Sequence, residues 1–96
     1  MSLGIALAGP VEPIQSTRDI PLRATFDVFI EGVGVIYRCR YVVHRGPPER
    51  EAIYGPSVQD RKTGGWPLLV KFDQATASRI LELVRPEYQA IAEAHA

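Results

Sequence analysis

The stretch RATFDVFIEGVGVIYRCRYVV, residues 23–43, decides the fold of this chain of 96 residues. Residues 23–31 alternate between apolar and polar side chains, a period that predicts a half-buried β-strand. The dipeptide Glu31-Gly32 suits a tight turn, because glycine readily adopts the positive φ that such turns need. Residues 33–43 then form a second, longer strand, and two strands this close in sequence favour an antiparallel hairpin.

The alternation assigns the side chains of the hairpin to two faces. In the first strand, Phe29 is the one apolar residue on the polar face. In the second strand, one face is expected to carry Val33, Val35, Tyr37, Cys39, Tyr41 and Val43. Arg38 and Arg40 point to the other face, about 7 Å apart by the rise of a strand. As the single cysteine, Cys39 forms no disulfide within the chain, and we expect a small core or interface residue rather than a reactive thiol.

Weaker patterns flank the hairpin. Residues 1–21 carry several glycines and prolines without a sustained period and are interpreted as an N-terminal arm, with room for a short strand at residues 3–8. Residues 22–96 are expected to form one domain. Within it, residues 52–54 are expected to form a third strand and residues 66–72 a fourth.

A helix is expected after these strands. Asp73 stands where an N-cap belongs, and residues 74–85 follow with an apolar stripe at helical spacing. The stripe consists of Ala77, Ile80, Leu81 and Val84. Pro86 either kinks this helix or begins a second one in its first turn. The predicted fold is therefore α+β, a four-stranded, mostly antiparallel sheet with the C-terminal helix packed on one face.

A sheet that one helix covers on one face keeps an uncovered face and two edges with unpaired backbone groups. A homodimer formed through an edge or a face would solve both problems. Residues 33–43 are the favoured dimer element, because this strand is longer than its neighbours.

The composition excludes several classes of protein. The 11 basic and 11 acidic residues give a formal net charge of zero, which argues against a histone-like nucleic-acid binder and an acidic disordered tail. No stretch approaches the roughly 18 apolar residues of a membrane span, and the N-terminal residues lack the basic segment of a signal peptide. We therefore expect a cytoplasmic protein without a membrane partner.

Little in the sequence supports catalysis. His44 ends a strand beside Arg45 and is interpreted as a solvated strand terminus, and His95 lies next to the last residue. Ser57 lacks the Gly-x-Ser-x-Gly elbow of a nucleophilic serine. No histidine pair or carboxylate cluster has metal-ligand spacing, and no glycine-rich loop has a nucleotide-binding pattern. We expect no enzymatic activity, no catalytic residue, no metal site and no cofactor.

The distribution of charge is more informative than its sum. Residues 37–62 hold six basic and three acidic residues, and five of the six are arginines, whose planar fork suits phosphate. The candidate nucleic-acid-binding residues are Arg38, Arg40, Arg61 and Lys62 for phosphates and Tyr54 and Trp66 for stacking on bases. The alternative is a solvated sheet face on which the two strand arginines pair with Asp27 and Glu31 across the hairpin.

Several features together resemble a known family. They are Ala24-Thr25-Phe26 at the start of the hairpin, the apolar second strand, Gly55-Pro56-Ser57 after the third strand, a basic loop with Arg61, Lys62, Gly64 and Gly65, and a helix that reaches Glu87-Tyr88. This layout resembles the SpoVG family of small bacterial regulators. The resemblance implies a dimeric sheet-plus-helix protein involved in nucleic-acid binding, in which Arg61 and Lys62 belong to the basic loop. Residues 62–72 and the following helix are also similar to the last strand and helix of single-stranded-DNA-binding transcriptional coactivators.

Two hypotheses of different classes follow. The first is a small dimeric nucleic-acid-binding or regulatory protein that contacts the phosphates of single-stranded or duplex nucleic acid through the arginine-bearing sheet face and the basic loop. The second is a protein–protein interaction module or structural subunit without nucleic-acid binding, in which Trp66 or Tyr54 anchors the partner.

Overall fold

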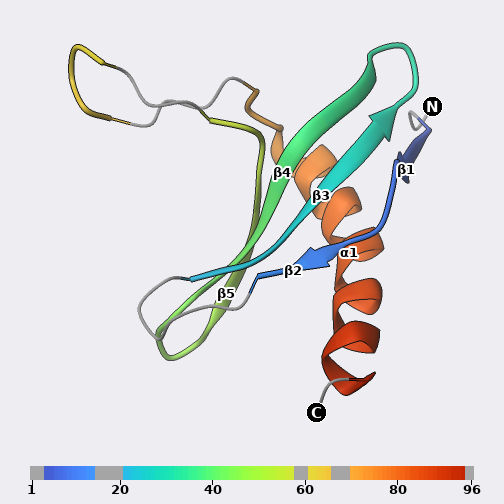
Figure 1. Cartoon of the computed structure of the whole chain (residues 1–96), viewed down its shortest axis with the longest axis vertical. Helices are drawn as coiled ribbons and strands as arrows, with labels where there is room; N and C mark the ends of the chain where they lie inside the picture. The colour runs from blue at the N-terminus through green and yellow to red at the C-terminus, as the bar shows by residue number, and fades with distance from the viewer. Residues whose placement is uncertain (1–3, 15–20, 58–60, 66–69, 95–96) are drawn as a thin grey trace.

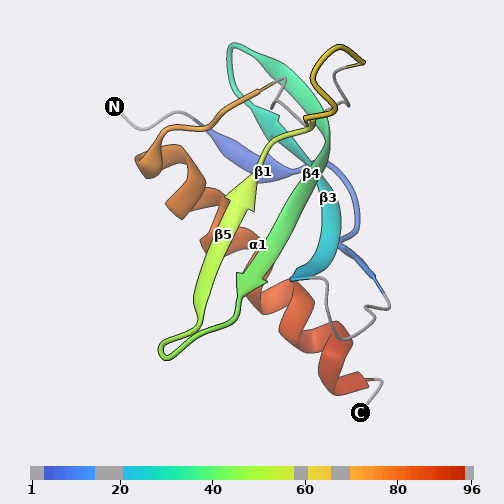
Figure 2. The ribbon, with the colours of Figure 1, turned by 90° about the vertical axis from the view of Figure 1, so that its left-hand side faces the viewer.

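The strands and the helix lie in two layers, an antiparallel sheet and a helix packed across one of its faces (Figures 1 and 2). The computed structural model describes residues 4–14, 21–57, 61–65 and 70–94. The elements of these residues are β1 (Ile5–Leu7), β2 (Glu12–Pro13), β3 (Leu22–Ile30), β4 (Gly34–His44), β5 (Arg50–Tyr54) and α1 (Gln74–Ala94). The predicted α+β fold, with an antiparallel sheet followed by a C-terminal helix, is confirmed.

The hairpin of β3 and β4 forms the centre of the sheet, whose order is β1-β3-β4-β5 with β2 also paired to β3. β1 and β2 lie one after the other along β3, since Ile5 pairs with Ile30 and Glu12 with Thr25. Between these two short strands, Val11 is buried in the core. The described part of the expected N-terminal arm therefore supplies two strands and a core side chain, and β1 is the short strand expected within it.

The face of the sheet toward α1 carries the hydrophobic core. Ile80 and Val84 of α1 are fully buried, and Ala77 and Leu81 pack beside them as the predicted stripe requires. The strand residues of the same cluster are Ala24, Phe26, Val28, Ile30, Cys39, Tyr41 and Ile53. The two layers are thus held together by one continuous apolar cluster.

The helix α1 begins after Asp73, as predicted. Oδ1 of Asp73 accepts a hydrogen bond from the backbone N–H of Thr76 at 2.7 Å, and the bonds with Thr76 lower the pKa of the carboxyl group. The helix continues through Pro86 to its end at Ala94, so no second helix begins at the proline. No helix in the described part of the chain has the length and apolar character needed to cross a membrane.

A β-bulge interrupts β4 opposite the middle of β3. Between the pairs Phe26–Cys39 and Val28–Ile36, β3 advances by two residues and β4 by three. Tyr37 and Arg38 of β4 therefore lie opposite the single residue Asp27 of β3. Arg38 has a φ of 60°, in the left-handed region that few side chains adopt. The bulge therefore shifts the side-chain alternation of β4 by one residue.

This shift corrects the predicted faces of the second strand. On the turn side of the bulge, Ile36 packs against the core. Val33, Val35 and Tyr37 are instead exposed, at 68%, 40% and 63%. The prediction that these three residues share the core face with Cys39 is wrong, because it assumed one unbroken strand period from end to end.

The strand predicted for residues 66–72 is absent over residues 70–72, and residues 66–69 lie outside the described residues. At Val70 the chain passes directly beside Gly55, just beyond the end of β5. A Cβ on Gly55 would lie 2.2 Å from the backbone oxygen of Val70, so only glycine fits at this contact. This close approach fixes the path of the chain shortly before α1 begins.

Candidate functional site

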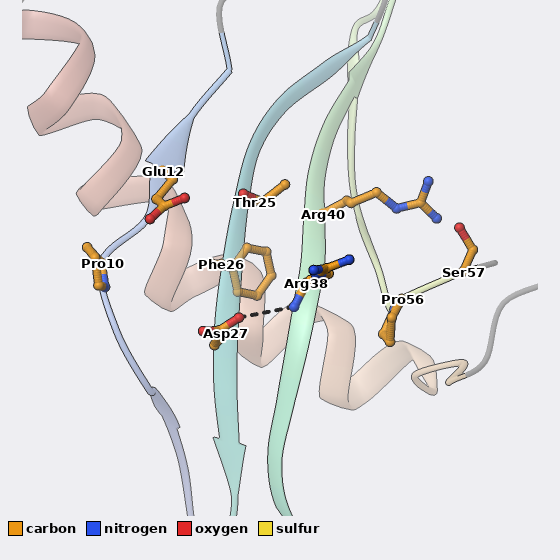
Figure 3. Close-up of a pocket in the computed structure, with 9 residues that line it drawn as sticks. All are labelled: Pro10, Glu12, Thr25, Phe26, Asp27, Arg38, Arg40, Pro56 and Ser57. Carbon is orange, nitrogen blue, oxygen red and sulfur yellow. Dashed lines mark hydrogen bonds between the residues drawn. The ribbon is translucent and has the colours of Figure 1, made fainter.

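An open groove of about 1110 Å³ lies on the face of the sheet opposite α1 (Figure 3). It is lined by Pro10, Glu12, Thr25, Phe26, Asp27, Arg38, Arg40, Pro56 and Ser57. We call it the sheet groove. Two of the predicted phosphate-binding residues, Arg38 and Arg40, are brought together in it.

Arg40 is held against the wall of the sheet groove. Its Nη2 donates a long hydrogen bond of 3.5 Å to the backbone oxygen of Gly55, and its guanidinium carbon lies 5.8 Å from the centre of the Tyr54 ring. Its Nε is buried and has no hydrogen-bond partner. Because a guanidinium carries five N–H donors, Arg40 keeps donors for a further acceptor.

Tyr54 packs beside Arg40 and contacts His44 through its hydroxyl and its ring. Its hydroxyl is 2.9 Å from Nε2 of His44, and the two rings meet edge to face with centroids 6.1 Å apart. The register places Tyr54 directly opposite Arg40 on the neighbouring strand. The half-buried ring is thus placed to position the guanidinium, a different role from the predicted stacking on bases.

Arg38 is exposed, and the bulge determines where its backbone lies. Oδ1 of Asp27 accepts the backbone N–H of Arg38 at 3.0 Å. Oε2 of Glu31 accepts the backbone N–H of Gly4 at 3.1 Å. Among the described residues, neither carboxylate forms an ion pair with Arg38 or Arg40; both accept backbone N–H groups instead.

The sheet groove is lined by two carboxylates and two guanidinium groups: Asp27 lies beside Arg38, whereas Glu12 and Arg40 lie on opposite sides of β3. Thr25 of β3 pairs with Glu12 on one side and with Arg40 on the other, so the carboxylate and the guanidinium flank β3. In Figure 3, Arg40 extends away from Glu12 and toward Ser57. An anion is therefore favoured at the β4–β5 side of the groove and disfavoured over β2.

The predicted basic loop lies apart from the sheet groove. Arg61 and Lys62 are exposed at a turn that continues to Gly64, whose φ of 73° requires the freedom of glycine. Figure 1 shows residues 61–65 projecting away from the sheet, and neither basic residue lines the groove. Trp66 lies outside the described residues.

A second polar cluster lies on the side of the sheet toward α1. The hydroxyl of Tyr41 donates to Oε2 of Glu51 at 2.5 Å, and Arg85 donates to both oxygens of Glu51 at 2.8 and 3.1 Å. The hydrogen bonds from Arg85 lower the pKa of Glu51, whereas burial raises the pKa of Tyr41. The ring of Tyr88 meets that of Tyr41 edge to face, with centroids 5.2 Å apart. This cluster joins α1 to β4 and β5, and the charge of Arg85 in it is paired with Glu51.

Cys39 behaves as a core residue. It is fully buried, and its Sγ lies 3.6 Å from the backbone oxygen of Ile36. Burial, with a smaller contribution from Asp27, raises the pKa of the thiol to about 12, so the thiolate is scarce at neutral pH. In the residues that the structure describes, no three His, Cys, Asp or Glu side chains are placed to hold a metal ion.

An exposed apolar patch at the turn end of the hairpin was missed by the sequence analysis. It consists of Phe29, Val33, Val35 and Tyr37, and we call it the hairpin patch. Phe29 carried a signal, because it breaks the polar face of its strand and is 43% exposed. The other three residues were placed on the strand face that carries Cys39; the bulge separates Val35 and Tyr37 from that face, and Val33 lies in the turn before β4.

Comparison of the chain with models of known protein families, with curated proteins and with solved structures gave no match.

Proposed function

We propose that this protein is a small dimeric nucleic-acid-binding regulator, located in the cytoplasm, that holds phosphates with Arg38 and Arg40 in the sheet groove. The observation that carries the proposal is the guanidinium of Arg40, which is half-buried and keeps donors without a protein acceptor. The buried Nε is closed to a ligand, but the Nη groups carry N–H donors beyond the one that Gly55 accepts, and an anionic oxygen would form charge-assisted hydrogen bonds with them. The resemblance to the SpoVG family points in the same direction.

Few contacts imply modest affinity with a clear dependence on salt. Each neutralised phosphate contributes about −0.7 on a single strand, or about −0.9 on a duplex, to the slope of log K against log salt concentration. The two groove arginines therefore account for a slope of about −1.4 to −1.8 per subunit. Arg61 and Lys62 would add to this slope where a long ligand reaches the projecting loop.

The dimer in the proposal uses the edge of β4. This strand has 11 residues, but its partner β5 has five and pairs only with residues 40–44. Within the described residues, no strand pairs with the other edge of residues 34–37. An antiparallel pairing of this edge with a second copy would extend the sheet and leave its outer face available to a ligand.

Binding is tested with fluorescent single-stranded and duplex oligonucleotides over a series of salt concentrations. The double variant Arg38→Glu/Arg40→Glu is expected to lower affinity at least about 10-fold and to flatten the salt dependence. Arg79→Glu is the control for charge: it makes half of this charge change on the exposed side of α1, and it is matched in charge to each of the single variants Arg38→Glu and Arg40→Glu. No detectable binding of either oligonucleotide at low salt would refute the proposal.

The hairpin patch favours a second candidate function, a protein–protein interaction module without nucleic-acid binding. Exposed apolar side chains gathered on one surface are typical of protein docking sites. Analytical ultracentrifugation of the Arg38→Glu/Arg40→Glu variant separates the two candidates. Lost oligonucleotide binding with an unchanged mass supports the nucleic-acid site, whereas a broken dimer places the arginines at a subunit interface.

A further inference from the structure

The hairpin patch lies directly beside the arginines of the sheet groove. Phe29 pairs with Val35 across the hairpin, and Tyr37 follows Val35 two residues later on β4. Tyr37 and Arg38 are neighbours in the chain, and both are exposed at the bulge. Two exposed aromatic residues and the two arginines of the site thus lie close together along the paired strands of the hairpin.

This continuity indicates which ligand the patch suits. An aromatic ring that is 43% or 63% exposed offers a flat face to solvent, and such faces stack on the bases of single-stranded nucleic acids. Tyr37 and Arg40 are three residues apart, which is at most about 10 Å of strand because the bulge lies between them, so a nucleic-acid strand whose phosphate lies on Arg40 reaches the rings with neighbouring bases. In a duplex, the base faces are already stacked on one another and are not available to the rings.

We infer that Phe29 and Tyr37 form a base-stacking surface and that the ligand of the Arg38–Arg40 site is single-stranded nucleic acid. This inference rests on the proposed function, because it assigns the ligand class of the same site. The arginines hold the backbone through charge, and the two rings distinguish unpaired bases from a duplex. Stacking tolerates every base, so the preference is for strandedness and not for sequence.

The test compares three labelled oligonucleotides of about 12 nucleotides, a length within the range of known single-strand sites. One is single-stranded, one is its duplex, and one has the same backbone without bases. The unmodified protein is expected to bind the single strand at least about 5-fold more tightly than the other two, the lower bound for stacking one base.

Substitution of the rings completes the test. Phe29→Ala and Tyr37→Ala are each expected to weaken single-strand binding about 5-fold or more, while binding of the abasic strand and the salt slope stay unchanged. Tyr37→Phe is expected to retain binding, because stacking needs the ring and not the hydroxyl. Val33→Ala is the matched control, since it truncates an exposed aliphatic residue of the same patch.

Each contrary result identifies which step fails. If Arg38→Glu weakens binding but the ring variants do not, and the abasic strand binds as well as the normal one, the inference is overturned and the proposed function stands. If none of the three oligonucleotides binds at low salt, the proposed function fails and the inference with it. If Phe29→Ala or Tyr37→Ala converts a dimer to a monomer without oligonucleotide, the patch is a subunit interface and the inference is overturned.

Discussion

The two faces of the hairpin are made by the same two strands and differ in almost every property. On the side toward α1, Val28 and Cys39 are fully buried against Ile80 of the helix cluster. On the opposite side, Val35 and Tyr37 are exposed next to a groove that contains two arginines. The buried face is explained by packing alone, whereas nothing in the packing of the described residues requires the arginines and aromatic rings of the outer face. The difference therefore separates the residues that build the fold from those that are free to bind a ligand.

The bulge beside Arg38 decides which residue of β4 belongs to which face. Without it, strict alternation would place Tyr37 in the core with Cys39 and would place Ile36 outside. With it, both Tyr37 and Arg38 are exposed, and a ring and a cation become neighbours on one surface. A single inserted residue thus changes which side chains of β4 are buried and which are exposed.

The largest effect is expected at the centre of the buried face. Ile80→Ala removes a fully buried side chain of α1 and leaves a cavity between helix and sheet, which lowers the free energy of unfolding by about 2–5 kcal/mol. Urea denaturation followed by circular dichroism measures the change. Arg79→Ala, at the exposed neighbouring position, is the control and is expected to have little effect. A comparable loss in both variants would show that the effect of Ile80→Ala does not come from its burial between helix and sheet, because alanine has a higher helix propensity than either native residue.

An intermediate change in the free energy of unfolding is expected at the bulge, which determines the face on which each residue of β4 lies. Asp27→Ala removes the acceptor of the Arg38 backbone N–H and is expected to cost about 1 kcal/mol of unfolding free energy. Asp27→Asn keeps a side-chain oxygen and is expected to retain most of this stability. The exchange rate of the Arg38 amide hydrogen, measured by NMR, reports the bond directly and should rise in the alanine variant alone. An exchange rate in the alanine variant that equals the rate of the parent protein would mean that Asp27 does not hold the bulge.

The parts of the fold that depend on local periodicity can be predicted from the sequence. The hairpin, the N-cap at Asp73 and the stripe that contains Ile80 and Val84 follow from spacing, and the structure confirms them. The bulge could not be predicted from the sequence. One inserted residue leaves apolar side chains on both faces of the strand, so no break in the alternation marks its position.

The pairing of β1 and β2 with β3 was out of reach for a different reason. Strands of three and two residues carry too few side chains to show an alternation, and their partners lie far along the sequence. For the site, strand alternation predicts that Arg38 and Arg40 share one surface, and the structure brings both into the sheet groove. Alternation could not assign Tyr54 to the support of Arg40, because that contact depends on the register between β4 and β5.

A smaller change in the free energy of unfolding, which depends on pH, is expected in the cluster of Tyr41, Glu51 and Arg85 that joins α1 to the sheet. The pKa of Glu51 is lowered in the folded protein, chiefly by Arg85, so its contribution is present above its usual pKa of about 4.5. The contribution is lost as the pH falls through the lowered folded value. Glu51→Gln removes the charge but keeps an acceptor for Tyr41. The variant is expected to be less stable at pH 7, with a difference from the parent that shrinks toward pH 3.

Denaturation at several pH values measures this difference, and repetition in high salt provides a second check. The side chains of Arg85 and Glu51 are 42% and 30% exposed, so screening by salt is expected to reduce the gap at pH 7. A gap that is constant with pH would show that the stability lost in the variant does not come from the charge of Glu51.

The smallest change in the free energy of unfolding is expected on the outer face, at Val35. It gives the most direct comparison of the two faces, because the same substitution can be made on each. Val28→Ala and Val35→Ala remove the same two methyl groups from paired strands of the hairpin, at residues that are 0% and 40% exposed. Val28→Ala is expected to cost about 2 kcal/mol or more through lost burial and a cavity, whereas Val35→Ala is expected to cost less than about 1 kcal/mol. The small remaining cost reflects the lower strand preference of alanine. If Val35→Ala instead destabilises the protein as much as Val28→Ala, and does so more strongly at higher protein concentration, the outer face is buried by a second copy. In that case the hairpin patch holds a dimer together, and the separation between a face that folds the chain and a face that binds its ligand no longer applies.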